Sequence, residues 1–494
     1  MLLDIKGEYF MTKENDLQNL QKKITDAYSA DFFNYQGNLM VDMLTEHLKT
    51  VTKSESHKNF SDKTPEEIVE IFKCDFKNKS EKSFIEIERE ILKESMPLHS
   101  PKYIGHQMAA PLPLAALSDM MMALLNNCNA VFETGRVAVG AEIAITKWMC
   151  SKIGFDDNAG GFLTSGGTLG NLTALLCARE VKNENDVWEH GVCKEKLAIL
   201  VPEESHYSIN RAAAIMGLGN DGAIQVASDE NHRMRIDELK STYEKAKKDG
   251  KKVFAVVANA CSTATGTYDN LIAIADFCKE HDLWMHVDGA HGAPALLSKN
   301  YKGLLKGIEN ADSVVWDGHK MMMMPTVVTG VLFKDHLNTQ QTFSQKASYL
   351  YEHTDEFDWY NFGKRTLECT KPFMSLKLYT ALKYYGEEFF GNFIDYTYGL
   401  TREFANIIEN SEDFELATQV QSNIICFRYL KKDTDLSKLQ NDIRNKLLAQ
   451  RDFYIVKTDL RGETYLRCTV INPYTGVEHL RCLLDDIREI AKTL

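Results

Sequence analysis

Five short apolar segments recur between residues 197 and 333, and they constrain the fold more than any other feature of the sequence. They read LAILVP, VFAVVAN, LWMHVD, SVVWD and GVLF, at residues 197–202, 253–259, 283–288, 313–317 and 330–333. Because successive side chains of a strand point to opposite faces, a segment that is apolar throughout predicts a strand buried on both sides. Helical stretches separate these segments, so the sequence predicts a mostly parallel sheet covered by helices.

The N-terminal part of the chain has a different pattern. Residues 1–100 are charged and helical in their spacing. The segment KTPEEIVEIFK contains a helix start, with Thr64 as the N-cap, Pro65 at the first helical position and Glu67 three residues after the cap. We expect this part to form a helical arm with little core of its own.

The predicted sheet lies within residues 101–380, and the pattern changes again after it. Residues 381–494 contain apolar stretches at 423–430 and 464–471 and end in an amphipathic helix over 478–494. We therefore expect a large α/β domain followed by a small C-terminal α/β domain.

Composition excludes several classes of partner. The formal net charge of −13 argues against nucleic acid and anionic membranes, which bind basic surfaces. The apolar stretch at 109–125 contains two prolines and Asp119, and it is shorter than the uninterrupted span of about 18 residues that a membrane helix needs. The 11 cysteines form no CxxC pair, and the N-terminus does not resemble a secretion signal. We expect a cytoplasmic protein with reduced thiols.

Polar motifs follow several of the predicted strands, where ligands of open α/β sheets bind. TSGGT at 164–168 leads into a helix, and its glycines and free backbone N–H groups suit a phosphate. It matches neither the dinucleotide motif nor the P-loop, and a simple turn before a core helix is the alternative. His206 and Lys320 each come just after a predicted strand, and Asp288 ends one.

Taken singly, these residues have ordinary explanations. Lysine at such a position is usually a surface residue, and aspartate is usually a turn former. His286, Asp288 and His291 could also be metal ligands, because alternate residues of a strand share a face.

The combination favours one cofactor. Pyridoxal 5'-phosphate (PLP) needs a helix start for its phosphate, a lysine to form a Schiff base with its aldehyde and an acidic partner for its pyridine nitrogen. Asp288 and Lys320 lie 32 residues apart, an interval that fits two strand ends separated by a helix. A metal hydrolase would use neither the lysine nor the phosphate site. We expect PLP as the cofactor and no metal.

The ordered motifs TSGGT, SHYS, HVDGAHG and DGHK resemble those of the group II PLP-dependent amino acid decarboxylases, over about residues 95–480. This family includes enzymes for glutamate, cysteine sulfinate, 2,4-diaminobutyrate and aromatic amino acids. The resemblance implies an α/β fold of PLP fold-type I, like that of aspartate aminotransferase.

The resemblance also implies the roles of the residues around the cofactor ring. Lys320 would form the Schiff base, and Asp288 would pair with the pyridine nitrogen. His206 would stack on one face of the ring, and Ala290 would pack against the other face.

Further cofactor contacts follow from the same resemblance. Gly167 and Thr168 would bind the phosphate through backbone and hydroxyl, and His319 would also reach it. Ser262 stands where the family has a threonine near the cofactor. Asp317 stands where some members have asparagine.

Two more segments resemble parts of the family that contact the substrate. ASYLYEHTDEFD at 347–358 resembles a mobile catalytic loop, whose Tyr349 would protonate the α-carbon. That loop is expected to reach the neighbouring subunit, which implies a homodimer with shared active sites. TYLRCTVINP at 464–473 resembles the strand whose arginine, Arg467, faces a substrate carboxylate. A packed tyrosine and a surface ion pair are the alternatives for these two residues.

The expected function is α-decarboxylation of an L-amino acid to its amine and carbon dioxide. Arg467 and the SYL sequence favour an acidic substrate, namely aspartate, glutamate or cysteine sulfinate. Gly105 and His106 replace an Asn-Gln pair of some glutamate enzymes, and His106 is a candidate for contacting the substrate side chain. The alternatives are diaminobutyrate or an aromatic substrate, aldehyde-forming oxidative decarboxylation, transamination, carbon–sulfur cleavage, or a cofactor-binding protein without catalysis.

Overall fold

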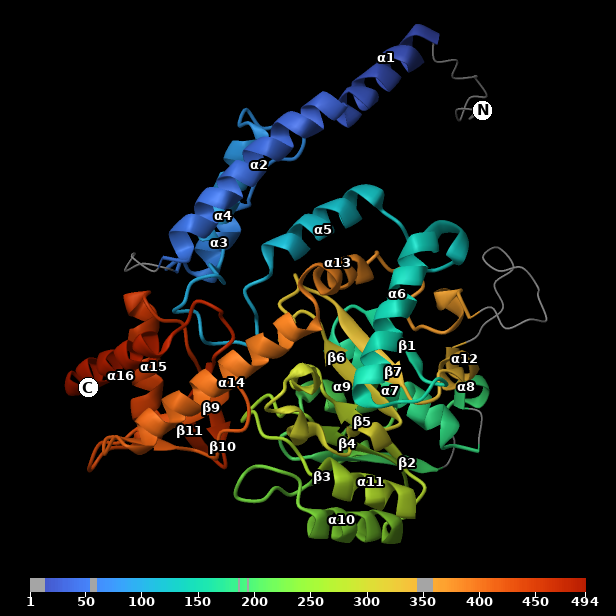
Figure 1. Ribbon diagram of the computed structural model, residues 1–494, viewed down its shortest axis with the longest axis vertical. Helices are drawn as coiled ribbons and strands as arrows, with labels where there is room; N and C mark the ends of the chain where they lie inside the picture. The colour runs from blue at the N-terminus through green and yellow to red at the C-terminus, as the bar shows by residue number, and fades with distance from the viewer. Residues whose placement is uncertain (1–13, 54–59, 185–186, 193–194, 344–358) are drawn as a thin grey trace, which may run out of the picture. The chain divides into compact units, whose positions relative to one another are not determined.

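The computed structural model divides into two units, Met1–Ser100 and Pro101–Leu494. The described residues are 14–53, 60–184, 187–192, 195–343 and 359–494. Figure 1 shows the elements of both units.

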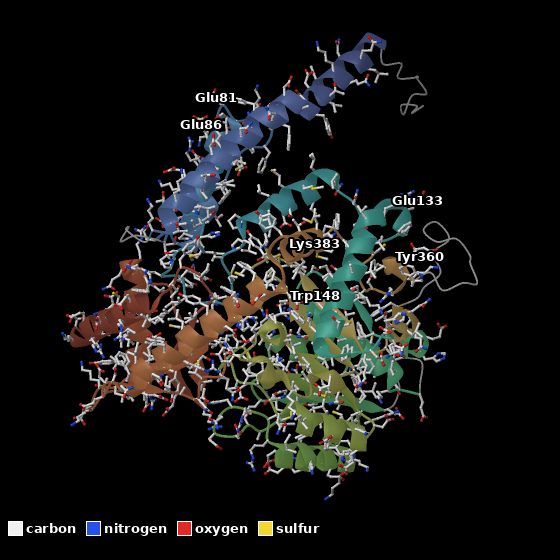
Figure 2. All side chains as sticks on the ribbon, viewed as in Figure 1. Glu81, Glu86, Glu133, Trp148, Tyr360 and Lys383 are labelled. Carbon is white, nitrogen blue, oxygen red and sulfur yellow. The ribbon has the colours of Figure 1, made fainter. Side chains whose placement is uncertain are left out.

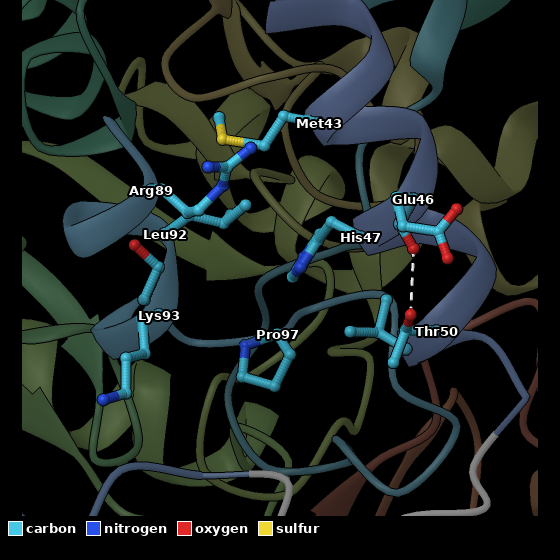
Figure 3. A pocket seen from close by; sticks show the side chains of 10 residues that line it. Met43, Glu46, His47, Thr50, Arg89, Leu92, Lys93 and Pro97 are labelled. Atoms are coloured by element: carbon cyan, nitrogen blue, oxygen red, sulfur yellow. Dashed lines mark hydrogen bonds between the residues drawn. The ribbon is translucent and has the colours of Figure 1, made fainter. Parts of the chain in front are cut away.

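The described elements of the first unit are helices. They are α1 (Glu14–Thr25), α2 (Ala30–Val51), α3 (Pro65–Ile71) and α4 (Phe84–Glu94). The predicted capping box is confirmed, since the backbone N–H of Glu67 donates to Thr64 Oγ1 at 3.2 Å and that of Thr64 donates to Glu67 Oε2 at 2.7 Å. Figure 3 shows a groove of about 440 Å³ that includes residues of α2 and α4, among them His47 and Arg89.

The second unit contains a seven-stranded sheet in the order β1-β7-β6-β5-β4-β2-β3. The strands are β1 (Gly160–Thr164), β2 (Lys196–Pro202), β3 (Ala223–Val226), β4 (Lys251–Asn259), β5 (Trp284–Asp288), β6 (Ser313–Asp317) and β7 (Thr329–Phe333). The pairs among β3, β2, β4, β5 and β6 are parallel, and β7 is antiparallel to both of its neighbours. The prediction of a mostly parallel sheet is confirmed, and the five apolar segments are strands.

Two hydrophobic clusters cover the two faces of this sheet, as the apolar strands predict. Alternate residues of β2 show the separation, because Ile199 belongs to one cluster and Leu200 to the other. The face with Ile199 packs against α7 (Gly167–Val181) and α9 (Tyr207–Ile215). The opposite face packs against α6 (Phe132–Ile153), α10 (Ile236–Lys248) and α11 (Leu271–Glu280). Trp148 of α6, labelled in Figure 2, lies with its ring 5.9 Å from that of Trp316 in β6.

A second, antiparallel sheet occupies the C-terminal part, in the order β10-β11-β9-β8. Its strands are β8 (Phe414–Leu416), β9 (Ile424–Tyr429), β10 (Val456–Leu460) and β11 (Glu463–Thr469). Helices α14 (Glu387–Glu409), α15 (Leu436–Gln450) and α16 (Val477–Lys492) share a hydrophobic cluster with it. The small C-terminal α/β part and the final amphipathic helix are therefore present as predicted.

The remaining helices of the second unit are α5 (Pro113–Leu125), α8 (Val187–His190), α12 (Leu337–Phe343) and α13 (Ser375–Tyr385). Among the described residues, we find no helix with the length and apolar character needed to cross a bilayer.

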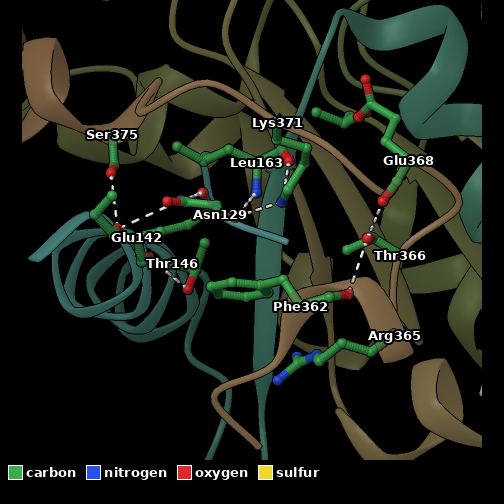
Figure 4. Close-up of polar contacts among 12 residues, drawn as sticks. Asn129, Glu142, Thr146, Leu163, Phe362, Arg365, Thr366, Glu368, Lys371 and Ser375 are labelled. Carbon is green, nitrogen blue, oxygen red and sulfur yellow. Dashed lines mark hydrogen bonds and ion pairs between the residues drawn. The ribbon is translucent and has the colours of Figure 1, made fainter. Parts of the chain in front are cut away.

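A buried ion pair links α6 to the chain segment that precedes α13 (Figure 4). Lys371 Nζ lies 2.7 Å from Glu142 Oε1 and donates to the carbonyl of Leu163 in β1 at 2.9 Å. Both charged side chains are fully buried. The remaining carboxylate oxygen of Glu142 accepts from Asn129 Nδ2 at 2.7 Å.

Candidate active site

Motifs far apart in the sequence meet at the carboxyl ends of the parallel strands. A cavity of about 250 Å³ there is lined by Ser165, Gly166, Gly167, Thr168, Asn171, His206, Cys261, Thr263, Asp288, Ala290, His291, Asp317, His319 and Lys320. Most of the predicted cofactor-binding residues are in this group.

The turn from β1 into α7 forms one end of the cavity. Gly166 has φ of 103°, a conformation that favours glycine, and no side chain caps the start of α7. A Cβ added at Gly167 would lie 3.4 Å from Asp317 Oδ1 and 3.5 Å from Ala290 Cβ, in the space that this glycine leaves open. Backbone N–H groups at a helix start and free space beside them suit a phosphate group.

Glu368, labelled in Figure 4, comes from a distant segment and supports this turn. Its carboxylate accepts hydrogen bonds from Thr164 Oγ1 at 2.5 Å and from Ser165 Oγ at 2.6 Å. These contacts fix the two residues that immediately precede the glycines.

Asp288 ends β5 and is 8% exposed. Its Oδ1 accepts from the backbone N–H of Ala290 at 3.2 Å, and its Oδ2 accepts from Asn171 Nδ2 at 2.9 Å. Within the described part of the chain, no cation forms an ion pair with this carboxylate. A buried charge normally has a charged partner, so Asp288 fits a ligand that brings a positive group, such as a protonated pyridine nitrogen.

His206 is the N-cap of α9. Its Nδ1 accepts from the backbone N–H of Ser208 at 3.3 Å and lies 2.8 Å from Ser208 Oγ. Burial lowers the pKa of His206 below its usual value. The ring is therefore neutral near pH 7, with its proton on Nε2, and is suited to packing on an aromatic ring.

Lys320 follows β6, and its ammonium has an acidic partner. Nζ lies 3.1 Å from Asp317 Oδ2, and the hydroxyl of Thr329 donates to Asp317 Oδ1 at 2.5 Å. The Asp317 side chain is 2% exposed and that of Lys320 is 20% exposed, so the amine reaches the cavity while the carboxylate stays buried. His319 contacts the backbone of Val328 through Nδ1, and its Nε2 lies 3.6 Å from Asp317 Oδ2.

A second cavity, of about 510 Å³, shares His206 and Thr263 with the first. Arg467 of β11 and His106 both line it, and their contact with a substrate stays a prediction. The guanidinium of Arg467 donates to the carbonyls of Thr263 at 2.6 Å and Ala264 at 3.2 Å. Arg467 is 5% exposed, and no carboxylate of the described residues pairs with it.

Ser262 does not line either cavity. Its hydroxyl donates to the carbonyl of Glu204 at 3.5 Å, and the adjacent Thr263 lines both cavities instead. Tyr349 lies outside the described residues.

The metal-site alternative for His286, Asp288 and His291 does not match the geometry. Both ring nitrogens of His286 are engaged, Nε2 with Asn171 Oδ1 at 3.0 Å and Nδ1 with Ser313 Oγ at 2.9 Å. In the part of the chain that the structure describes, no three His, Cys, Asp or Glu side chains form a group that could hold a metal ion.

Sequence reasoning missed Asn171, although one signal for it exists. Asn171 lies four residues after Gly167 on α7, so both face the cavity, and it is a polar residue beside the apolar positions Leu169 and Leu172. The contribution of Glu368 had no local signal, because it comes from a distant segment.

Comparisons with known proteins identify the family of this chain. A family model for the pyridoxal-dependent decarboxylase conserved domain matches residues 65–430. An aspartate 1-decarboxylase from Aliivibrio fischeri is 30% identical over 458 residues, with 82% of each chain covered. An aromatic-L-amino-acid decarboxylase from Bacillus atrophaeus is 29% identical over 411 residues, which are 82% of this chain and 84% of that one.

The fold gives the same result. The crystal structure of mouse CSAD matches with a TM-score of 0.84 and 26% identity, covering 92% of this chain and 100% of that one. The mostly parallel sheet and these structural relatives confirm the predicted PLP fold-type I architecture. The matched family model covers most of the sequence, and the chain belongs to the pyridoxal-dependent decarboxylase family, whose members are PLP-dependent carboxy-lyases of amino acids.

Proposed function

We propose that this enzyme decarboxylates an acidic L-amino acid, namely aspartate, glutamate or cysteine sulfinate, to the corresponding amine and carbon dioxide. The observation that carries the proposal is Arg467, a buried guanidinium that lines the second cavity and, among the described residues, is held by backbone carbonyls with no carboxylate partner. A buried cation without a carboxylate partner favours an anionic ligand. Arginine binds carboxylates through two parallel hydrogen bonds.

Charges of both signs line the second cavity. Lys457 donates to the amide oxygen of Asn441, and Arg461 donates to the carbonyl of Asp229, so both cations have neutral acceptors in these contacts. The carboxylate of Glu204 is already occupied by His232 Nδ1, at 2.8 Å, and by a serine hydroxyl. The carboxylates of Glu203 and Asp459 also line the cavity and accept from a backbone N–H and a threonine hydroxyl. The preference for an anionic ligand therefore rests on Arg467.

Each residue of the proposed cofactor site would have its own role. PLP, when bound, withdraws electrons from the α-carbon of an attached amino acid, so that the bond to the α-carboxylate can break. Lys320 would hold the cofactor covalently, and Asp288 would keep a proton on its ring nitrogen. His206 and Ala290 would enclose the ring, while Gly167, Thr168 and His319 would bind the phosphate.

The substrate contacts complete the proposed reaction. Arg467 would bind one carboxylate of the amino acid, and His106 would contact its side chain. Tyr349 would deliver a proton to the α-carbon after carbon dioxide leaves, which yields an amine rather than an aldehyde.

The test is a substrate screen with the PLP-loaded protein. We expect carbon dioxide and amine in equal amounts with at least one of the three acidic amino acids, and little turnover of diaminobutyrate or aromatic amino acids. A preference for one of the latter two classes would refute the acidic substrate, and aldehyde with ammonia would refute simple decarboxylation. After borohydride reduction, peptide mass spectrometry should find PLP on Lys320, and the Lys320→Ala variant should retain none.

We also propose that the enzyme is a cytoplasmic homodimer with shared active sites. Large apolar side chains of α1 and α2 are exposed, including Leu20, Ile24 and Phe32, and such surfaces are typical of protein interfaces. All ten cysteines of the described residues are free, which suits a reducing compartment. The negative net charge supports small molecules rather than nucleic acid or membranes as ligands. Light scattering should give twice the chain mass, and a fully active monomer would contradict the shared sites.

A further inference from the structure

A single buried amide connects the two side chains that are expected to contact the cofactor ring. Asn171 of α7 is 1% exposed. Its Nδ2 donates to Asp288 Oδ2 at 2.9 Å and to Ser208 Oγ at 3.0 Å. Its Oδ1 lies 3.0 Å from His286 Nε2. All of the hydrogen-bonding capacity of the amide nitrogen is therefore directed at the active-site residues.

The orientation of this amide follows from its partners. The carboxylate of Asp288 can only accept, so Asn171 must present Nδ2 to it, and Oδ1 must face His286. His286 therefore donates from Nε2, which makes its Nδ1 an acceptor. The hydroxyl of Ser313 supplies the proton at 2.9 Å, and Ser313 Oγ itself accepts from Trp284 Nε1 at 2.8 Å. Each donor in this chain of hydrogen bonds has one acceptor.

The second branch of the network reaches His206. Because Ser208 Oγ accepts from Asn171, its own hydroxyl proton is free to donate to His206 Nδ1, 2.8 Å away. The network needs a neutral His286, and burial lowers the pKa of His286 to about 4. The network therefore keeps one pattern of protons across the neutral pH range.

We propose that Asn171, held in place by His286, is a positioning residue that fixes both Asp288 and His206 for the cofactor ring. This inference rests on the proposed function, because it takes Asp288 and His206 as the cofactor contacts. All supporting groups are neutral, so they orient the carboxylate without neutralising it. A cation in place of Asn171 would compete with the ring nitrogen for the charge of Asp288.

The first experiment measures PLP affinity of the apoprotein and the pH dependence of the absorbance of bound PLP. Asn171→Leu keeps the approximate shape of the side chain and removes its donors. It should raise the PLP Kd by about tenfold or more, since a hydrogen bond to a charged group is lost. It should also shift the pH at which the bound cofactor changes its spectrum. Ser208→Ala removes only the branch to His206 and should leave that pH unchanged while weakening binding.

A second pair of variants separates positioning from packing. In the His286→Gln variant, the glutamine amide can donate to Asn171 Oδ1 in place of the histidine Nε2. The leucine side chain of His286→Leu cannot donate. We expect Gln to restore most of the PLP affinity and the spectral pH dependence that Leu loses. Thr173→Val is the matched control, because Thr173 lies on the same helix, is 1% exposed and donates only to the carbonyl of Leu169. It should bind PLP like the wild type.

The outcomes separate the positioning role of Asn171 from the proposed decarboxylase function. Wild-type affinity and spectral pH dependence in Asn171→Leu would overturn the positioning role, and so would equal losses in His286→Gln and His286→Leu. If Asn171→Leu does not fold, the His286 pair and Ser208→Ala carry the decision. A wild-type protein that binds PLP but releases no carbon dioxide from any amino acid would refute the proposed function and leave the binding test valid.

Discussion

Replacing Lys371 by methionine should destabilise the unit Pro101–Leu494 more than any surface charge change. Methionine has a similar length, so the main loss is the ammonium group. In the wild type this group lies 2.7 Å from Glu142 Oε1 and 2.9 Å from the carbonyl of Leu163 (Figure 4). The variant leaves the carboxylate of Glu142 buried without its cation.

The size of the effect follows from the burial of both partners. Lys371 and Glu142 have 0% exposed side chains, and removal of one partner from a buried pair destabilises a protein by about 3–5 kcal/mol. Hydrogen bonds from Asn129 and from the backbone of Leu163 to Glu142 remain, so we expect the lower end of this range. The double variant Lys371→Met with Glu142→Leu removes the isolated charge and should regain much of the loss.

The assay is urea unfolding of the apoprotein, followed by tryptophan fluorescence. Lys73→Met is the control, since Lys73 pairs with Glu70 at the surface with both side chains about 70% exposed, and it should have no measurable effect. Equal effects of the two lysine variants would refute the reasoning, and so would a double variant that is no more stable than Lys371→Met.

Three further predictions concern the cavities. Gly167→Ala should leave the thermal midpoint unchanged, because its Cβ has only ordinary contacts, but it should weaken PLP binding by occupying the phosphate space. Arg467→Met should raise KM for the acidic substrate by about 10- to 100-fold, measured by initial rates, and an unchanged KM would remove Arg467 from the substrate site. Burial lowers the pKa of His291 to about 3 in the folded protein. As the pH drops, this histidine therefore binds a proton in the unfolded chain before it does so in the folded protein. The free energy of unfolding then decreases below about pH 6.5. His291→Gln should make that fall shallower in acid unfolding, and an identical pH dependence would contradict a neutral His291.

The sequence alone was sufficient for the strands that are apolar on both faces. Strand β3 was not predicted, because AIQV is short and its Gln225 is exposed. The antiparallel direction of β7 had a signal, since residues 318–328 are too few for the helical crossover that parallel neighbours need. This signal concerns connection length rather than side-chain pattern.

The motifs of the active site could be predicted, but their supports could not. Lys320, Asp288 and His206 follow strands, and strand ends of a parallel sheet meet at one edge. Asn171 acts through partners on other elements, and spacing along the chain does not indicate which polar residues will meet. The same limit applies to Ser262, because spacing along a loop does not indicate which of the adjacent residues Ser262 and Thr263 lines the cavity.

Asp288 and Arg467 are two buried charges with no charged partner among the described residues, and they explain how one ligand set could stabilise this site. Asp288 is negative in the first cavity, and Arg467 is positive in the second, which shares His206 and Thr263 with it. Each uncompensated charge destabilises the empty fold, so a ligand with a cationic ring nitrogen and a ligand with a carboxylate should each raise the thermal midpoint. One ligand would compensate both charges only if the amino acid were attached to the cofactor, because only then would it lie in both cavities at once. The two charges therefore suit an amino acid attached to PLP, since the ring nitrogen and a carboxylate are both present in such a ligand, independently of the motifs that identify the family.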